Sequence, residues 1–200
     1  MLRMDTEEEK KFIQEIKQAI ANSRGYADHF GWPPDRDIEE YSVVKALCNS
    51  LEKEGNFFID CNSITIRGRG KDPPDCEAKD VDGNNIGVEV TELVDPNAIM
   101  AFKKNQVYEW AEWDKAKLVD AINKRLDTKN TPERIKGGPY EKYILIIHTD
   151  EPILDVDYAN NLLKKHRFNK RELIDRAFLL ISYDPRYQTD PYIELEFAGT

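Results

Sequence analysis

The sequence predicts an α/β or α+β domain with a mixed central sheet flanked by helices. Two nearly continuous apolar runs, YILII at 143–147 and AFLLI at 177–181, are typical of strands buried on both faces of a sheet. The order of the other segments points the same way. Helices come first, followed by a meander of strands, a long helix, and then a strand, a helix and a strand.

The N-terminal part of the chain is predicted to be a helix and a loop. A helix is expected over about residues 6–22, because Thr6 and Glu9 form a capping-box pattern ahead of an apolar stripe. Residues 25–34 (GYADHFGWPP) form a loop rich in glycine, proline and aromatic side chains. This loop either packs as a lid or simply connects two elements at the surface.

Length and composition indicate one domain that stays out of the membrane. The 200 residues suit a single domain, with residues 1–36 as an extension and residues 37–200 as the core. No apolar run approaches the roughly 18–20 residues of a membrane span, and the first residues lack a signal-peptide core. Three cysteines without paired spacing favour the cytoplasm and argue against a disulfide framework or a zinc site.

A second helix is expected to begin after an N-cap at Asp37 and to end before Gly55. Its apolar stripe consists of Tyr41, Val44, Leu47, Cys48 and Leu51. Glu40 lies on the edge of that stripe, where it either reaches inward to a site or serves the first turn of the helix. Two short strands are expected next, at 57–60 and 64–67.

A long helical region is expected from about residue 98 to residue 126 or slightly beyond, and a break in its middle stays open. Its later part carries Leu118, Ile122, Arg125 and Lys129 in one line. The basic residues of this line either point toward the carboxylates described below or complement the helix dipole. Trp110 and Trp113 either stack on a ligand or pack against the domain. The remaining expected elements are a loop at 131–139, a helix at 156–166 and a last strand at 192–197.

The stretch 72–95 (DPPDCEAKDVDGNNIGVEVTELVD) is predicted to be a β-hairpin. Turn residues separate two alternating runs, which is the usual hairpin pattern. A two-residue turn would mix apolar and polar residues on each face. A three-residue turn at 82–84 pairs Ala78 with Val88 on the apolar face. Because a one-residue slip moves every side chain to the other face, a hairpin with one buried face favours this second register.

The favoured register gathers the carboxylates of Asp75, Glu77 and Glu89 on one face, with Glu77 across from Glu89. Cross-strand neighbours lie roughly 5 Å apart, so these charges repel one another. A divalent cation is the simplest compensation, and Mg²⁺ favours such oxygen ligands. The hairpin therefore predicts a cation site before any family is considered.

Pro74-Asp75 at the head of one strand, followed by Glu89-Val90-Thr91 in the next, resembles the motif of the PD-(D/E)XK nuclease superfamily. The resemblance extends over about residues 37–197, because a helix precedes the hairpin, a helix follows it, and apolar strands come afterwards. It implies a restriction-endonuclease-like fold with a mixed central sheet flanked by helices.

The resemblance also implies roles for particular residues. Asp75 and Glu89 would hold one or two Mg²⁺ (or Mn²⁺) ions, which activate a water and stabilise charge on the scissile phosphate. The carbonyl of Val90 stands where a further ligand is often supplied. A glutamate of the preceding helix is sometimes recruited, and Glu40 is the best placed, with Glu39 next.

Thr91 departs from the family pattern, which usually has lysine there to orient the water and neutralise developing charge. Some members resemble this chain in having Glu-Val-Thr and a relocated lysine. Lys129, with Arg125 one turn earlier, would then supply the charge from the following helix, and Lys79 is a second candidate. We therefore expect Asp75, Glu89, Thr91 and Lys129 to form the catalytic set.

The resulting expectation is a Mg²⁺-dependent phosphodiesterase acting on nucleic acid, with DNA preferred. One alternative is an inactive nuclease-fold protein that acts by binding in a DNA-processing or defence complex. Another is an α/β protein in which the hairpin is only a hairpin. A homodimer would suit a cutter of palindromic sites, but no dimerisation helix is recognisable, so the oligomeric state stays open.

The net charge limits how the protein can attach to nucleic acid. The value of −9 argues against broad electrostatic attachment to nucleic acid but leaves room for a local basic groove. Arg67, Arg69 and Lys71 precede the hairpin, and a second basic cluster lies at 164–171. The simpler interpretation of each cluster is an ordinary solvated surface.

Overall fold

The computed structural model describes residues 35–104, 106 and 111–199, together with Lys11, Ile13, Gln14 and Lys17. These four positions are helical and exposed. The rest of the predicted first helix and the aromatic loop at 25–34 lie outside the described residues, as does Trp110.

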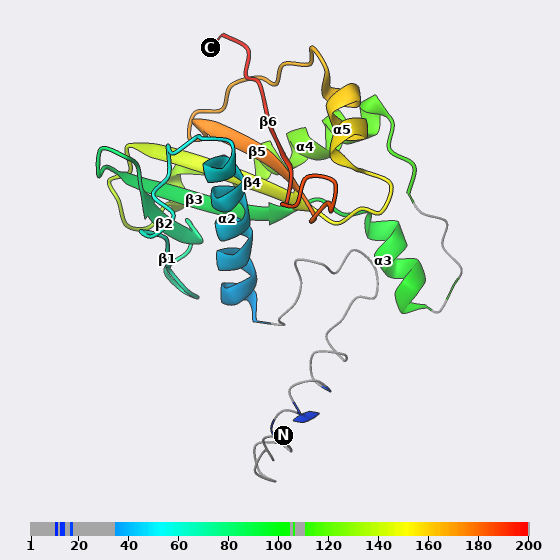
Figure 1. Cartoon of the computed structure of the whole chain (residues 1–200), viewed down its shortest axis with the longest axis horizontal. Helices are drawn as coiled ribbons and strands as arrows, with labels where there is room; N and C mark the ends of the chain where they lie inside the picture. The colour runs from blue at the N-terminus through cyan, green and yellow to red at the C-terminus, as the bar shows by residue number, and fades with distance from the viewer. Residues whose placement is uncertain are drawn as a thin grey trace.

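A six-stranded mixed sheet forms the centre of the described chain (Figure 1). Its strands lie side by side in sequence order: β1 (Thr65–Ile66), β2 (Cys76–Lys79), β3 (Asn85–Glu92), β4 (Lys142–Thr149), β5 (Arg176–Ile181) and β6 (Tyr192–Glu194). The pairs β1–β2, β2–β3 and β5–β6 are antiparallel, whereas β3–β4 and β4–β5 are parallel. The predicted mixed sheet is confirmed, and the two apolar runs form its buried centre, β4 and β5.

Helices cover both faces of the sheet. The described helices are α2 (Arg36–Lys53), α3 (Pro96–Lys103), α4 (Lys115–Lys129), α5 (Val156–Leu163) and the short 3-10 helix η1 (Pro132–Arg134). In Figure 1, α2 crosses the near face of the sheet, and α4 lies behind it. This arrangement confirms the predicted fold class.

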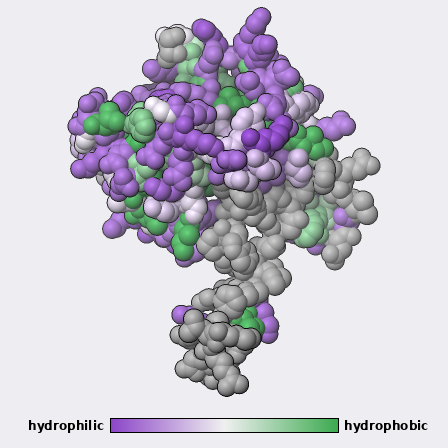
Figure 2. Space-filling model, in the orientation of Figure 1, coloured by the Kyte–Doolittle hydropathy of each residue, from purple (hydrophilic) through white to green (hydrophobic). Residues whose placement is uncertain are grey.

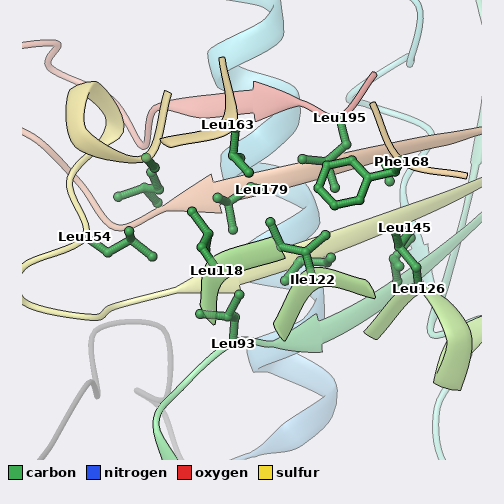
Figure 3. Packing of buried hydrophobic residues seen from close by; sticks show 14 of the residues in the cluster. Leu93, Leu118, Ile122, Leu126, Leu145, Leu154, Leu163, Phe168, Leu179 and Leu195 are labelled. Carbon is green, nitrogen blue, oxygen red and sulfur yellow. The ribbon is translucent and has the colours of Figure 1, made fainter. Parts of the chain in front are cut away.

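Two apolar cores lie on the two faces, because successive residues of each strand point in opposite directions. On one face, Val44 and Leu47 of α2 pack with Val88 of β3. On the other face, side chains of α4 and α5 pack with alternate residues of the strands (Figure 3). The α4 stripe consists of Leu118, Ile122 and Leu126, all fully buried. This alternation places Val88 and Val90 toward α2 and the intervening Glu89 toward α4.

The long helical region is broken. The α3 helix ends at Lys103, and residues 111–114 are not helical. The Asp114 carboxylate then caps α4 by accepting a hydrogen bond from the backbone N–H of Lys117 at 2.7 Å. A side-chain cap of this kind starts a new helix, which gives the physical reason for a second segment.

Two element predictions are wrong in detail. The N-cap of α2 is Asp35, whose side chain accepts from the N–H of Asp37 at 2.9 Å, so Asp37 belongs to the first turn. The stretch 57–60 is not a strand. The Asp60 carboxylate accepts from the N–H of Asn62 at 2.9 Å, which turns the backbone locally instead of extending it.

The cysteine prediction is wrong in one part, the absence of a disulfide. Cys48 of α2 and Cys61 form a disulfide with a Cα–Cα distance of 5.8 Å, and Cys76 is free and buried. The two bonded cysteines are 13 residues apart, a separation that carries no disulfide pattern in the sequence.

Hydrophilic residues cover most of the described surface on the face shown in Figure 2, and hydrophobic residues appear there in small separate patches. No helix in the described part of the chain is long and apolar enough to cross a membrane. The apolar side chains are instead gathered in the two cores.

Candidate active site

The hairpin has a three-residue loop, but its position differs from the prediction. The strands pair Cys76 with Val88 and Ala78 with Ile86, so the loop is 81–83, one residue earlier than expected. Gly83 has a φ of +84°, the left-handed conformation that closes such a loop. The shift moves the register by two residues, so each side chain stays on the face of the hairpin where it was predicted.

The Asp80 side chain explains why the loop sits there. Its Oδ1 accepts hydrogen bonds from the backbone N–H groups of Asp82 and Asn84, at 3.0 and 2.9 Å. Its Oδ2 accepts from the Asn84 side-chain amide at 3.1 Å. An aspartate that satisfies the loop backbone in this way selects the turn.

The corrected register separates Glu77 from the other two carboxylates. Glu77 pairs with Gly87, not with Glu89. Its carboxylate forms an ion pair with Arg67 and accepts a hydrogen bond from the Tyr140 hydroxyl. Glu77 is thus engaged away from Glu89, and the predicted trio of carboxylates becomes a pair.

Asp75 and Glu89 form that pair, at the point where β2 and β3 separate. The β2–β3 pairing ends at Cys76 and Val88, while β3 continues to Glu92. The Asp75 Oδ2 atom accepts a hydrogen bond from the backbone N–H of Val90 at 2.8 Å, which ties it beside Glu89. This hydrogen bond takes the place of the backbone–backbone hydrogen bond that would come next if the pairing of β2 with β3 continued.

Both carboxylates are buried, at 2% exposure for Asp75 and 4% for Glu89. Burial raises the pKa of Asp75, although the Val90 N–H, Lys129 and Arg36 oppose the shift. Burial also raises the pKa of Glu89, and the nearby Asp75 charge adds to that effect. The fold therefore holds two neighbouring carboxyl groups out of water, where their ionised forms are disfavoured.

Lys129 reaches the pair from the last turn of α4 and forms an ion pair with Glu89 Oε1. The other oxygen, Oε2, accepts a hydrogen bond from the Tyr143 hydroxyl at 3.1 Å. These two contacts fix the Glu89 carboxylate. Thr91 is half-buried, and it lines a pocket together with Lys129.

Arg36 reaches the pair from the opposite side, at the start of α2. Its Nη2 atom lies 3.5 Å from Asp75 Oδ1 and 3.7 Å from Asp72 Oδ2, and its Nε donates to Glu40 Oε1 at 2.5 Å. Burial, together with the Asp75 charge, raises the pKa of Glu40 to about 7. Arg36 thus links Glu40 to the buried carboxylate.

An open pocket of about 290 Å³ lies beside the pair, although neither Asp75 nor Glu89 is among the residues that line it. It is lined by Arg36, Glu39, Glu40, Val90, Thr91, Glu92, Lys129 and His148. The backbone N–H of Val90 is committed to Asp75, and its side chain belongs to the core on the α2 face.

Asp75, Glu89 and Glu40 carry carboxylate oxygens, the ligand type that hard divalent cations prefer. Among the described residues, the group of three possible ligands whose ligand atoms all lie within 4.8 Å of one another is Cys48, Glu52 and Cys61. That group is no thiolate site, because its cysteines are bonded to each other. The three carboxylates are spread more widely, with the Arg36 guanidinium between Glu40 and Asp75.

Two of the predicted cations lie elsewhere. Arg125 donates to the backbone carbonyls of Glu92 and Ala121, at 3.0 and 3.1 Å. Its guanidinium is therefore bound at the end of β3 and does not contact the carboxylate pair. Lys79 is exposed at the far end of β2, opposite Asn85. Trp113 is buried and donates its ring N–H to a glutamate at 3.2 Å, which is a packing role.

Sequence reasoning missed Arg36 and Tyr143. Arg36 stands four residues before Glu40, a spacing that places two side chains together on a helix and could have identified it. Tyr143 meets Glu89 only through the parallel pairing of β3 with β4, in which it stands opposite Gly87. No local pattern carries that contact.

Comparisons with protein-family profiles, with curated proteins and with solved structures find no match. The geometry of the site therefore carries the functional argument.

Proposed function

We propose that this chain is a nuclease of the PD-(D/E)XK type, which hydrolyses phosphodiester bonds of nucleic acid, in the first place DNA, with Mg²⁺ or Mn²⁺. One observation carries the proposal. Two buried carboxylates, Asp75 and Glu89, meet where two strands separate, and each contacts a cation borne by a helix. Buried like charges cost stability, so their presence beside an open pocket favours a functional role.

Each residue has a role in this proposal. Asp75, Glu89 and, in support, Glu40 would hold the ion, whose chemistry when bound is activation of water and stabilisation of phosphate charge. The Val90 N–H fixes Asp75, and the Tyr143 hydroxyl fixes Glu89. Lys129 brings a positive charge to the place where Thr91 has none, and it is available to orient the attacking water and to neutralise charge on the phosphate.

Metal-dependent cleavage tests the proposal. Purified protein with Mn²⁺ or Mg²⁺ is incubated with single-stranded, duplex and branched DNA and with RNA. We expect cleavage of at least one of them, and we expect Glu89→Ala to lower the rate by at least about 100-fold, a typical loss when one preorganised charge contact is removed. Asp82→Ala, which removes an exposed carboxylate from the same hairpin, is the matched control and should cleave normally. Full activity of Glu89→Ala would overturn the site.

A second function is favoured by the ion pairs themselves. Because Arg36 and Lys129 already neutralise the two carboxylates, the site is also suited to a protein that binds nucleic acid without cutting it. Calorimetry with Mn²⁺ separates the two functions. Heat of binding at millimolar Mn²⁺ that is lost in Glu89→Ala supports the nuclease, whereas no heat in the wild type, together with retained nucleic-acid binding, supports the second function.

A further inference from the structure

Two loops beside the site carry four exposed cations. The first loop, 67–74, leads directly into Asp75, and the second, 131–141, connects α4 to β4. Their exposed basic residues are Arg69, Lys71, Arg134 and Lys136. We call these two loops with their four cations the basic rim. Among the residues that the structure describes, none of the four forms a salt bridge at contact distance, although the charges of Lys136 and Lys71 act on the nearby carboxylates of Asp72 and Glu77.

Arg67 fastens the first loop. Its Nε and Nη2 atoms donate to the carbonyl of Lys71, at 3.2 and 2.9 Å, which closes the loop on itself. Its Nη1 atom donates to the Tyr140 hydroxyl at 2.8 Å and forms the ion pair with Glu77. The Arg67 side chain is only 12% exposed, so its charge is used inside the protein and not offered to a ligand.

The second loop is joined to the first. The backbone N–H of Lys136 donates to the carbonyl of Pro73 at 2.8 Å, and its Nζ donates to the carbonyl of Gly70 at 3.1 Å. Gly137 has a φ of +82°, and a Cβ atom there would lie 2.2 Å from Arg67 Nη1, so glycine suits both the backbone conformation and the approach of the two loops. The rim is thus one connected surface and not two independent tails.

The rim also adjoins the carboxylate pair. Pro74 packs closely over Gly87, where an added Cβ would lie 3.3 Å from it and 2.9 Å from the Tyr143 ring. Tyr143 in turn holds Glu89. Asp72, at the end of the same loop, lies 3.7 Å from the Arg36 guanidinium that contacts Asp75. A phosphate held by the rim would therefore be a near neighbour of the site.

The net charge of −9 does not oppose such contacts. Electrostatic interactions in physiological salt are screened over about 8 Å, so a phosphate at the rim is influenced mainly by the charges closest to it. Exposed cations that are not held in an ion pair at contact distance are available to bind a nucleic-acid backbone and release its counterions.

We infer that the basic rim binds the phosphate backbone of the nucleic acid next to the scissile bond. This inference rests on the proposed function, because it places the same substrate at the same site. The contacts are to phosphates, so they hold and orient the strand without selecting a base sequence.

Salt-dependent binding tests the inference. The affinity for a fluorescein-labelled duplex DNA is measured by anisotropy, with Ca²⁺ in place of Mg²⁺, at several salt concentrations. We expect the double variant Arg69→Glu/Lys71→Glu to bind on the order of tenfold more weakly. Its plot of log K against log salt should be shallower by about 2, since two phosphate contacts are lost at about 0.9 each. A matching RNA duplex shows whether the rim prefers one nucleic acid.

The matched control is Lys164→Glu/Lys170→Glu, which makes the same change of charge at two exposed residues of the second basic cluster. It should lose less than about twofold in affinity, because neither residue belongs to the two loops of the rim. Equal losses of affinity in both variants would overturn the inference about the rim. An unchanged affinity of the rim variant, in a protein that still cleaves, would do the same and leave the proposed function standing. A wild-type protein that neither binds nor cleaves nucleic acid would overturn the proposed function and the rim together. The charge reversal could also disturb folding. The neutral variant Arg69→Ala/Lys71→Ala controls for this, and we expect it to bind DNA more weakly than the wild type by a smaller factor.

Discussion

Arg36 occupies the space between Glu40 and Asp75, the two carboxylates that it contacts at 2.5 and 3.5 Å. A divalent cation bound to both would have to displace the guanidinium. The Arg36 side chain is 52% exposed, so it can leave toward solvent without unfolding the helix. At the scale of one residue, Arg36 would therefore compete with a metal ion for these carboxylates.

Removing Arg36 should consequently tighten metal binding. We expect Arg36→Ala to bind Mn²⁺ about fivefold more tightly in calorimetry, because a half-exposed ion pair of this kind is worth about 1 kcal/mol. Arg36→Lys keeps the charge and should resemble the wild type. Unchanged or weaker Mn²⁺ binding in Arg36→Ala would show that Arg36 and the metal do not compete.

The residues of the site were predictable to different degrees. Asp75 and Glu89 followed from alternation in the hairpin and from the resemblance, and Lys129 followed from its place in line with the α4 stripe. Glu77 was predicted in the same cluster because the predicted register, two residues away from the observed one, pairs Glu77 with Glu89. Arg36 was missed even though its spacing from Glu40 is visible in the sequence.

At the scale of the element, Asp80 determines the register of the hairpin. The carboxylate accepts two backbone N–H groups of the loop and contacts Lys142 Nζ at 3.3 Å. The hydrogen bond from the Asn84 side chain, with these others, lowers the pKa of Asp80 to about 2. Because the pKa is lower in the folded protein than in the unfolded chain, the ionised form stabilises the fold.

Asp80→Ala should therefore lower the urea midpoint at pH 7, and the deficit should shrink in acid. The sign follows from the depressed pKa: the stabilisation is present above the ordinary pKa of 3.8 and is lost as the pH falls toward 2. Urea midpoints of wild type and variant at pH 7, 4 and 2.5 measure this convergence. Asp82→Ala, in the same loop, should show almost no deficit at any pH. A deficit of Asp80→Ala that stays constant down to pH 2.5 would contradict this role of the carboxylate.

Elements with long patterns were predictable, and those set by a single side chain were not. The apolar runs of β4 and β5 predict strands directly, because a strand buried on both faces is apolar at nearly every position. The boundary at Asp114 and the turn that follows Asp60 depend on one capping or turn-forming aspartate each. The loop at 81–83 depends on Asp80 together with the left-handed Gly83. The Cys48–Cys61 disulfide depends on tertiary proximity, which no local pattern encodes.

At the scale of the whole molecule, the site joins the two halves of the protein. Arg36 comes from the helix that covers one face of the sheet, and Lys129 comes from a helix on the other face. The two can meet the same carboxylate pair because β2 stops pairing at Val88 while β3 continues. The end of the β2–β3 pairing thus lets residues of both helices contact the carboxylate pair.

This arrangement predicts that the fold is less stable than it could be. Because burial raises the pKa of Asp75, the ionised carboxylate is unfavourable in the folded protein at neutral pH, and a neutral isostere should relieve that cost. Asn retains an oxygen that can accept from the Val90 N–H. We expect Asp75→Asn to raise the Tm in EDTA by about 2–4 °C, the shift that ~1 kcal/mol gives in a domain of this size.

Metal should reverse this order of stability. An ion that binds only the folded protein stabilises it by about 2.7 kcal/mol at a hundredfold excess over its Kd, so the wild-type Tm should rise with Mn²⁺ concentration. Asp75→Asn lacks one ligand charge, and its Tm should stay flat over the same range. Thermal melts of both proteins in EDTA and in increasing Mn²⁺ make the comparison, with Asp82→Asn as the control that should follow the wild type. Parallel curves for wild type and Asp75→Asn would mean that Asp75 is not a metal ligand, whatever its effect on the metal-free fold.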